Sequence, residues 1–268
     1  MHPVLIDIGP LQIRSYGFML ALSFLAGMYL AARRAKRAGV EPQHILDLSV
    51  YIILAAVVGS RLLYVVFHLD EFSSPVEFFA LWRGGATFYG GMLAAMLVSY
   101  AFLARKRLSF LRVADITAPS VALGVAITRV GCFMSGCCYG KPTTLAWGVT
   151  FPPDSAAGQS AAEAAHALGL TTVALHPAQL YASAYGLVIL AALLALEPRL
   201  RARRGATLGL LLVLYGVARF AVDFVRSYEA NARVVFGLTF NQLISIALFA
   251  LGVFLMVQRP ASAGAGRS

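Results

Sequence analysis

The sequence predicts an all-α polytopic membrane protein with seven transmembrane helices. Of its 268 residues, 59% are hydrophobic and only 13% are charged, whereas a soluble domain carries about 25% charged residues. Seven apolar stretches each have close to the ~20 residues that a helix needs to cross ~30 Å of hydrocarbon. Most of the 22 Lys and Arg residues lie in the short segments between these stretches, which is the distribution that membrane topology produces.

The candidate spans follow one another along nearly the whole chain, which we expect to form a single membrane domain of residues 1–268. One long connection, at about 135–178, separates the fourth span from the fifth and is predicted to form a small outer head segment. The tail 258–268 is predicted to be disordered. The spans cover residues 17–34, 46–67, 87–104, 113–134, 179–196, 206–226 and 239–257.

The basic residues indicate which way the chain crosses the membrane. The segments after spans one, three and five read "RRAKR", "RKRLSFLR" and "RLRARR", and Arg259 and Arg267 lie in the tail. By the positive-inside rule these segments are cytoplasmic. The N-terminus is therefore expected outside and the C-terminus in the cytoplasm. This distribution also explains the net charge of +10 without a nucleic-acid partner.

Three arginines lie inside apolar spans, where a charge costs at least ~2.5–3.5 kcal/mol and usually faces a partner or a cavity. Arg61, Arg129 and Arg219 lie about six, five and seven residues from the outer ends of their spans. At ~1.5 Å per residue, all three reach a depth of roughly 7–11 Å. Three cations at one level predict an anion-binding cavity, and a phospholipid phosphate is the most available anion there.

Polar residues accompany these arginines at helical spacing. Tyr215, Arg219, Asp223 and Arg226 follow one another at intervals of four, four and three, so they share one helical face. One alternative is a salt bridge between Arg219 and Asp223 that only holds helices together. A single carboxylate, however, does not neutralise three arginines.

The outer segments supply further candidates. The stretch "RGGATFYGGML" carries Tyr89 and the pair Gly90 and Gly91, and glycines allow close backbone approach to a ligand. In "ALHPAQLYASAYG", His176 precedes Pro177, a residue that suits the first turn of a helix. The alternatives are an interfacial aromatic for Tyr89 and a capping or surface role for His176.

The chain resembles the prolipoprotein diacylglyceryl transferase family along nearly its whole length. Six stretches carry the resemblance, in order: "IGPLQIRSYGFMLALSFLAG", "GSRLLYVVF", "RGGATFYGGML", "ADITAPSVALGVAITRVGCFMSGCCYG", "HPAQLYASAYG" and "YGVARFAVDFVR". Their order and the independently derived topology make the resemblance specific.

The resemblance implies transfer of diacylglyceryl from phosphatidylglycerol to the lipobox cysteine in the signal peptide of a preprolipoprotein, with release of glycerol phosphate. It implies a multi-pass protein of the bacterial inner membrane, surrounded by membrane lipids, with its active site towards the outer leaflet and no cofactor. Arg129 and Arg219 would hold phosphate, Tyr215 would orient the site, Asp223 would support Arg219, and His176 would stand near the entrance. Arg61, Gly90 and Gly91 would contribute to substrate binding.

Several positions depart from the family pattern. Tyr89 replaces a histidine, Cys132 and Ser135 replace asparagines, and Cys137 and Ala182 replace glutamates. An ordinary tyrosine with a pKa near 10 is a poor base at neutral pH unless nearby cations lower that pKa. Tyr89 is therefore a catalytic candidate beside two other bases, His176 and Asp223. A different acceptor, in a related enzyme with the same lipid donor, also remains open.

The three cysteines of "GCFMSGCCYG" allow four interpretations. Cys132, Cys137, Cys138 and His176 could bind zinc, although C-x4-C-C is not the usual C-x2-C spacing. A Cys132–Cys137 disulfide suits an oxidising compartment. Cys137 could carry a covalent intermediate. We predict instead that the thiols line a pocket wall without metal, with Cys132 and Ser135 in contact with substrate.

A non-catalytic phospholipid-binding or transport protein is the rival class. Transporters more often show internal repeats and broken helices near the midplane. The present sequence shows no convincing repeat, and its charged groups lie near one surface. These features favour an interfacial enzyme.

Overall fold

The computed structural model describes residues 2–8, 11–69, 72, 74–79, 85, 87–228, 233–235 and 237–258. The chain divides into two compact units, one of residues 1–30 and 114–268 and one of residues 31–113. The division falls within helices α1 (Ser15–Arg37) and α4 (Phe110–Met134). The single domain expected from the sequence stays a prediction, and the tail 259–268 lies outside the described residues.

Each predicted span coincides with a helix to within a few residues. Among the described residues, six helices are long and apolar enough to cross a membrane, while α3 has a shorter apolar segment, Tyr89–Arg105. The protein is therefore mostly helical, as predicted, and the count of seven spans is not established. The remaining span helices are α2 (Pro42–Phe67), α3 (Phe88–Arg105), α6 (Ala178–Leu200), α7 (Ala206–Asp223) and α8 (Phe240–Val257).

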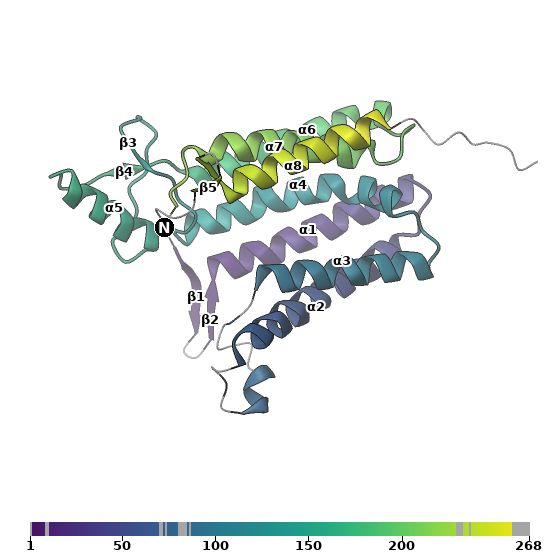
Figure 1. The fold of residues 1–268 in the computed structure, drawn as a ribbon, viewed down its shortest axis with the longest axis horizontal. Coiled ribbons are helices and arrows are strands. Elements are labelled where there is room, and N and C mark those ends of the chain that lie inside the picture. The colour runs from purple at the N-terminus through teal and green to yellow at the C-terminus, as the bar shows by residue number, and fades with distance from the viewer. Residues whose placement is uncertain are drawn as a thin grey trace, which may run out of the picture. The chain divides into compact units, whose positions relative to one another are not determined.

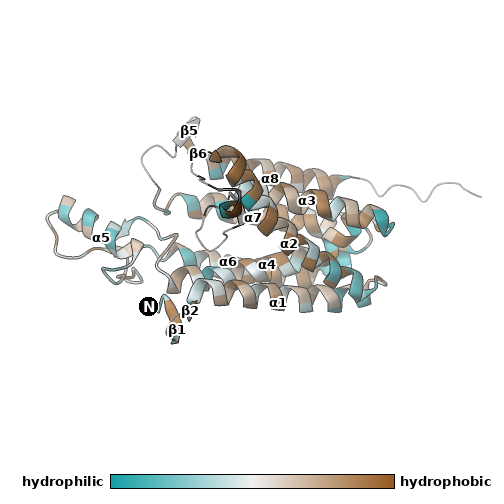
Figure 2. Cartoon of the chain, turned by 90° about the horizontal axis from the view of Figure 1, so that it is seen from below, coloured by the Kyte–Doolittle hydropathy of each residue, from teal (hydrophilic) through white to brown (hydrophobic). Residues whose placement is uncertain are grey.

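Large apolar side chains cover the surfaces of these helices. Val58, Leu97 and Val188 are 64%, 70% and 67% exposed, and Figure 2 shows hydrophobic colour along most of each long helix. A soluble monomer rarely exposes such continuous apolar surface. These faces are therefore suited to contact lipid.

The structure also contains elements that an all-α prediction omits. In the described part of the chain, three two-stranded antiparallel sheets lie outside the long helices, and their strands of two to five residues are too short to show a clear strand period in the sequence. A 3₁₀ helix, η2 (Pro75–Phe79), lies in the second unit. The strands are β1 (Val4–Ile8), β2 (Leu11–Arg14), β3 (Pro142–Thr143), β4 (Ala174–Leu175), β5 (Arg233–Val235) and β6 (Leu238–Thr239).

In the first unit, α4, α6 and α7 pack around a core that includes Ala122, Leu193 and Leu211. Gly186 on α6 allows close packing, because an added Cβ would lie 2.9 Å from the backbone nitrogen of Ala126 on α4. Gly209 and Gly252 bring α7 and α8 together in the same way. Small residues at helix contacts are the usual means of close packing in membranes.

A carboxylate on α4 caps α7. Asp115 accepts hydrogen bonds from the backbone nitrogens of Gly205, at 2.6 Å, and Leu208, at 2.9 Å. Helix N-termini leave such N–H groups without an internal partner and favour negative charge. The cap therefore fixes the start of α7 against α4.

The connection between α4 and α6 is a small folded segment. It contains α5 (Ala156–Ala167) and the β3–β4 pair, which Figure 1 shows beyond the ends of α4 and α6. Phe151, Ala157, Ala161 and Leu175 form its apolar cluster. The predicted head segment at 135–178 thus has secondary structure and a core of its own.

Candidate functional site

A pocket of about 220 Å³, partly open to solvent, lies in the first unit where α4, α6 and α7 meet the residues that follow α4 and α7. Three arginines, one thiol and the phenol of a tyrosine supply its polar groups. Its lining residues are Arg129, Cys138, Ala178, Ala182, Tyr185, Arg219, Val222 and Arg226. The predicted residues Arg129 and Arg219 therefore share one pocket.

Arg219 is held in place by a buried hydrogen-bond network. Its Nη1 donates to Oδ1 of Asp223 at 2.8 Å, and both residues are less than 10% exposed. Tyr228 also donates to Oδ1 of Asp223, and Thr239 donates to Oδ2. Both carboxylate oxygens are thus occupied, so Asp223 is a support for Arg219 and is poorly placed to accept a proton from a substrate.

Tyr228 links this network to its surroundings. Its hydroxyl accepts hydrogen bonds from Nη2 of Arg219, at 2.8 Å, and from Nδ2 of Asn241, at 3.2 Å. Burial, and then its hydrogen bond to Asp223, raise the pKa of Tyr228 above its usual value. The phenol therefore stays protonated and keeps its bond to the carboxylate.

The positive charges of two arginines in the pocket are not neutralised by a carboxylate of the described residues. Among the described residues, no carboxylate pairs with Arg129 or Arg226. The Nε of Arg226 is buried without a hydrogen-bond partner in that part of the chain, and its guanidinium lies 5.2 Å from the ring centre of Tyr228. Three guanidinium groups and the single carboxylate of Asp223 leave a net charge of +2, which favours an anion.

Two tyrosines lie together beside these arginines. The rings of Tyr185 and Tyr215 meet edge to face, with centroids 5.9 Å apart. Tyr215 was predicted from the sequence, whereas Tyr185 was not. Tyr185 lies seven residues after Ala178 on α6, and this spacing places both residues on the face of the helix that lines the pocket.

The three cysteines come together through the way α4 ends. The backbone N–H of Cys137 bonds to the carbonyl of Cys132 at 3.1 Å, and that of Gly136 bonds to the carbonyl of Phe133 at 3.2 Å. With Gly136 at φ 65°, these bonds form a Schellman motif, in which the side chains at the positions of Cys132 and Cys137 face each other. Cys138, at φ 59°, then turns back towards them.

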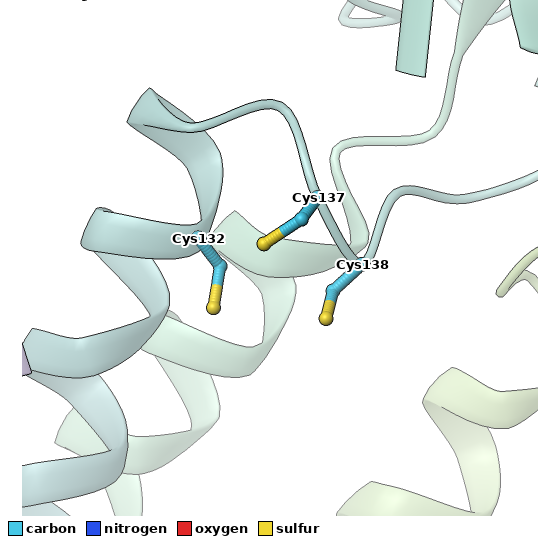
Figure 3. A group of neighbouring side chains, drawn as sticks. All are labelled: Cys132, Cys137 and Cys138. Carbon is cyan, nitrogen blue, oxygen red and sulfur yellow. The ribbon is translucent and has the colours of Figure 1, made fainter. Parts of the chain in front are cut away.

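The resulting cluster contains three free thiols, and Figure 3 shows their sulfur atoms directed into one space. The sulfurs all lie within 4.8 Å of one another. Nη1 of Arg129 donates to Sγ of Cys132 at 4.0 Å. Hydrogen bonds from the Cys132 and Cys137 thiols, helped by the charges of Arg226 and Arg129, lower the pKa of the Cys138 thiol.

His176 and Ser135 lie in the first unit but are not among the residues that line the pocket. Nδ1 of His176 is 3.2 Å from the hydroxyl of Tyr181, which accepts a hydrogen bond from Trp147 at 2.8 Å. His176 is not a member of the thiol cluster. The structure therefore does not bring it to the three cysteines as the fourth zinc ligand considered from the sequence. Ser135 directly follows the last residue of α4 and is half-buried.

Arg61 lies in the second unit, where it binds backbone carbonyls. Its guanidinium donates to Glu77 at 2.8 Å, Phe78 at 2.9 Å and Gly85 at 2.9 Å. It thereby holds the 3₁₀ helix η2 to the end of α2. Its convergence with Arg129 and Arg219 stays a prediction.

Gly90 and Gly91 use their close backbone approach to pack α3 against α2. An added Cβ on Gly90 would lie 2.3 Å from the carbonyl oxygen of Gly59, and one on Gly91 would lie 2.9 Å from that of Ala56. Tyr89 is the second residue of the same helix and is 54% exposed. Substrate contact at these positions stays a prediction, and Arg83, at the start of the same motif, lies outside the described residues.

Sequence reasoning missed part of this site. Tyr228 and Thr239 lie beyond the end of α7, where no periodic pattern relates them to Asp223. Arg226 belonged to the predicted polar stripe, but its position near the outer end suggested a solvated surface charge. Its place in the pocket depends on the turn that follows α7.

Comparison with known proteins gives one consistent result. The family described as prolipoprotein diacylglyceryl transferase matches residues 3–258. A phosphatidylglycerol–prolipoprotein diacylglyceryl transferase of Nitratidesulfovibrio vulgaris strain Miyazaki F is 35% identical, over 98% of this chain and 96% of its own length. The protein of the same name from Xanthomonas euvesicatoria is 36% identical over 96% and 90%, and that from Clostridium tetani is 31% identical over 95% and 96%.

Proposed function

This chain belongs to the prolipoprotein diacylglyceryl transferase family, and we propose that it transfers diacylglyceryl from phosphatidylglycerol to the lipobox cysteine of a preprolipoprotein. The products are a thioether-linked lipid and glycerol phosphate. Its relatives' names supply the donor and the class of acceptor. The chemistry of the pocket supports the same assignment.

The observation that carries the proposal is a pocket lined by three arginines, one of which is paired with a carboxylate. Arg129 and Arg226 have no carboxylate partner among the described residues, while Arg219 is fixed by Asp223. Guanidinium groups bind phosphate oxygens through paired hydrogen bonds. The pocket is therefore suited to the phosphate of an anionic phospholipid, and its apolar walls at Ala178, Ala182 and Val222 suit the adjoining lipid.

The same arginines would assist the reaction itself. The acceptor thiolate attacks a glyceryl carbon, and the bond from that carbon to a phosphate oxygen breaks. Negative charge then grows on the departing glycerol phosphate, where fixed cations stabilise it. Tyr215, with Tyr185 against its ring, would orient the lipid between α6 and α7.

The candidate bases that would deprotonate the acceptor thiol lie outside the lining of the arginine pocket. Tyr89 stands where the family has a histidine, and His176 stands near the start of α6. Arg61, Gly90 and Gly91 would shape the outer segment that carries Tyr89, while Cys132 and Ser135 would contact the substrate near the end of α4. Asp223 is the weakest candidate base, because both of its oxygens already accept hydrogen bonds.

We place the protein in the bacterial inner membrane with seven spans, its N-terminus outside and its C-terminus in the cytoplasm. The basic segments after spans one, three and five support this orientation. With this orientation, the pocket faces the outer leaflet, where a translocated signal peptide presents its lipobox cysteine.

The direct test uses purified protein in vesicles that contain phosphatidylglycerol, with a synthetic lipobox peptide as acceptor. Mass spectrometry should find the peptide carrying diacylglyceryl, together with an equal amount of glycerol phosphate. A peptide with serine in place of the lipobox cysteine is the matched control and should stay unmodified.

Two other outcomes would favour other functions. Glycerol phosphate without modified peptide would indicate another acceptor, which the departures at Tyr89, Cys132 and Cys137 make the second candidate. Saturable binding of phosphatidylglycerol without any product would indicate a lipid-binding or transport protein.

A further inference from the structure

The end of α4 builds the three-thiol cluster from backbone geometry. The Schellman motif brings Cys132 and Cys137 together, and the left-handed backbone of Cys138 adds the third thiol. Gln179 on α6 anchors the turn, since its Nε2 donates to the carbonyl of Cys137 at 2.7 Å. Non-glycine residues at positive φ are uncommon and mark positions where the surrounding structure maintains the strain.

The spacing of the sulfurs suits a metal. Zinc binds thiolates at about 2.3 Å in a tetrahedron, which places neighbouring sulfurs about 3.8 Å apart. The three sulfurs here all lie within 4.8 Å of one another, so side-chain rotations that move each sulfur by less than about 1 Å would complete the geometry. A disulfide would use two of the thiols and leave the third without a role.

The number of ligands indicates the type of site. Within the part of the chain that the structure describes, no histidine, cysteine or carboxylate joins the three thiols as a fourth ligand. Structural zinc sites have four protein ligands, whereas catalytic ones have three and keep a position open for water or substrate.

The surrounding charge suits such a site. Three thiolates and one Zn²⁺ carry a net charge of −1, and Arg129 donates to Sγ of Cys132 at 4.0 Å. Groups that hydrogen-bond to the ligands orient them and tune the metal. Cys138 also lines the pocket with Arg129, Arg219 and Arg226, so a metal on these thiols would adjoin the proposed phosphate site.

We propose that Cys132, Cys137 and Cys138 bind a zinc ion whose open position takes the thiol of the acceptor cysteine. This inference deepens the proposed function and rests on it. Spacing along the sequence argued against a metal, and the convergence of the sulfurs in space is the reason to revise that prediction.

The chemistry balances without an oxidant or a further reactant. The acceptor thiol displaces the metal-bound water and releases its proton to solvent, because a coordinating thiol is deprotonated. The bound sulfur then forms its bond to the glyceryl carbon as the carbon–oxygen bond to phosphate breaks. The thioether product is neutral and a weaker ligand, so water replaces it.

Cobalt substitution tests the site directly. The protein is prepared without a histidine tag, reduced, washed with chelator and titrated with Co²⁺. We expect one equivalent per chain with the absorption of tetrahedral cobalt–thiolate bonds. The lipobox peptide should change this spectrum, whereas the peptide with serine in place of cysteine should not.

Variants separate the cluster from other metal-binding groups. Cys132→Ser, Cys137→Ser and Cys138→Ser should each weaken cobalt binding. His166→Ala is the matched control, because His166 is an exposed imidazole on α5 in the same segment, and it should leave binding unchanged. Chelator treatment should slow transfer in the wild type by about 10²-fold or more, the scale of assisted proton removal, and Zn²⁺ should restore it.

The outcomes distinguish this inference from the proposed function. Full transfer activity in metal-free protein, or a disulfide between two of these cysteines in the active enzyme, would overturn the zinc site and leave the function intact. A cobalt spectrum that responds to the peptide thiol, without thioether product from the zinc form, would support the site and contradict the transfer reaction. Absence of stoichiometric cobalt binding by the reduced protein would overturn the site outright.

Discussion

At the residue scale, the strongest prediction concerns Arg129, which has no carboxylate partner among the residues that the structure describes. Arg129→Ala should lower kcat/KM by about 10²–10³-fold, the usual loss when one group that stabilises developing charge is removed. Arg129→Lys should recover little, because lysine keeps the charge and loses the paired contact to phosphate. The assay is transfer to a lipobox peptide.

The matched control is Arg201→Ala, which removes an exposed arginine paired with Glu197 at 3.1 Å. A surface pair of this kind contributes little, so activity should stay near that of the wild type. Equal losses in both variants would contradict a specific role for Arg129.

Tyr228 provides a test of positioning. Tyr228→Phe removes the hydroxyl that bonds to Arg219 and Asp223 but keeps the ring beneath Arg226. Hydrogen bonds to charged groups contribute ~1.5–3 kcal/mol, so kcat should fall by about 10- to 150-fold. Arg219→Ala should cost more, since it removes the cation itself. A Tyr228→Phe enzyme with unchanged kcat would show that Asp223 alone orients Arg219.

The role of Tyr89 separates two ways of deprotonating the acceptor. If zinc holds the thiolate, Tyr89→Phe should keep activity within about tenfold of the wild type, because no phenolic base is then needed. If Tyr89 is the base, the same change should cost about 10²–10⁴-fold, and Tyr89→His should keep activity with a lower pH optimum. The activity of His176→Ala in the same assay tests His176 as the third candidate for deprotonating the acceptor thiol.

At the element scale, the turn after α4 can be tested through a pair of glycines. Gly136 and Gly169 have φ values of 65° and 67°, so alanine costs about 1–2 kcal/mol of backbone strain at either position. At Gly136 the added Cβ would also lie 2.7 Å from the Cβ of Ser155, whereas at Gly169 nothing lies within 4 Å. Gly136→Ala should therefore weaken cobalt binding, and Gly169→Ala should not. Equal effects on binding would mean that the turn geometry does not hold the cysteines.

Helix positions were predictable because each span is a long apolar run between charged segments. The span predicted at 113–134 corresponds to the helix Phe110–Met134, and the helix predicted at 206–226 ends at Asp223. That early end matters, because residues past Asp223 leave the helical register and carry Arg226 and Tyr228 into the site. Strands of two residues such as β3 and β4 carry no detectable period, so the sequence offered no signal for them.

The site was predictable only where helical spacing decides contact. The four-residue interval between Arg219 and Asp223 predicted that they share one helical face, and the two side chains form an ion pair in the structure. The meeting of Cys132, Cys137 and Cys138 depends on two left-handed residues after the helix, which spacing in the sequence does not encode. Thr239 donates a hydrogen bond to Asp223, which lies sixteen positions earlier in the chain. The sequence contains no pattern that predicts this contact.

At the scale of the whole molecule, topology is the main prediction. Reporter fusions at Arg107 and at the C-terminus should show cytoplasmic activity, and a fusion within α5 should show external activity. The two cytoplasmic positions serve as controls for each other. Reporter activity on the same side for Arg107 and α5 would contradict the orientation, since one span, α4, separates them.

The cap of α7 by Asp115 has a consequence for how the chain is made. The carboxylate meets its partners 90 and 93 positions later in the chain, so α4 enters the membrane long before Gly205 and Leu208 are synthesised. Until then Asp115 has no helix end to bind. The docking of α7 on α4 is thus a late step in biogenesis, and a ribosome that stalls before residue 205 would leave a nascent chain in which α4 and α6 are complete but the arginine pocket has not yet been assembled.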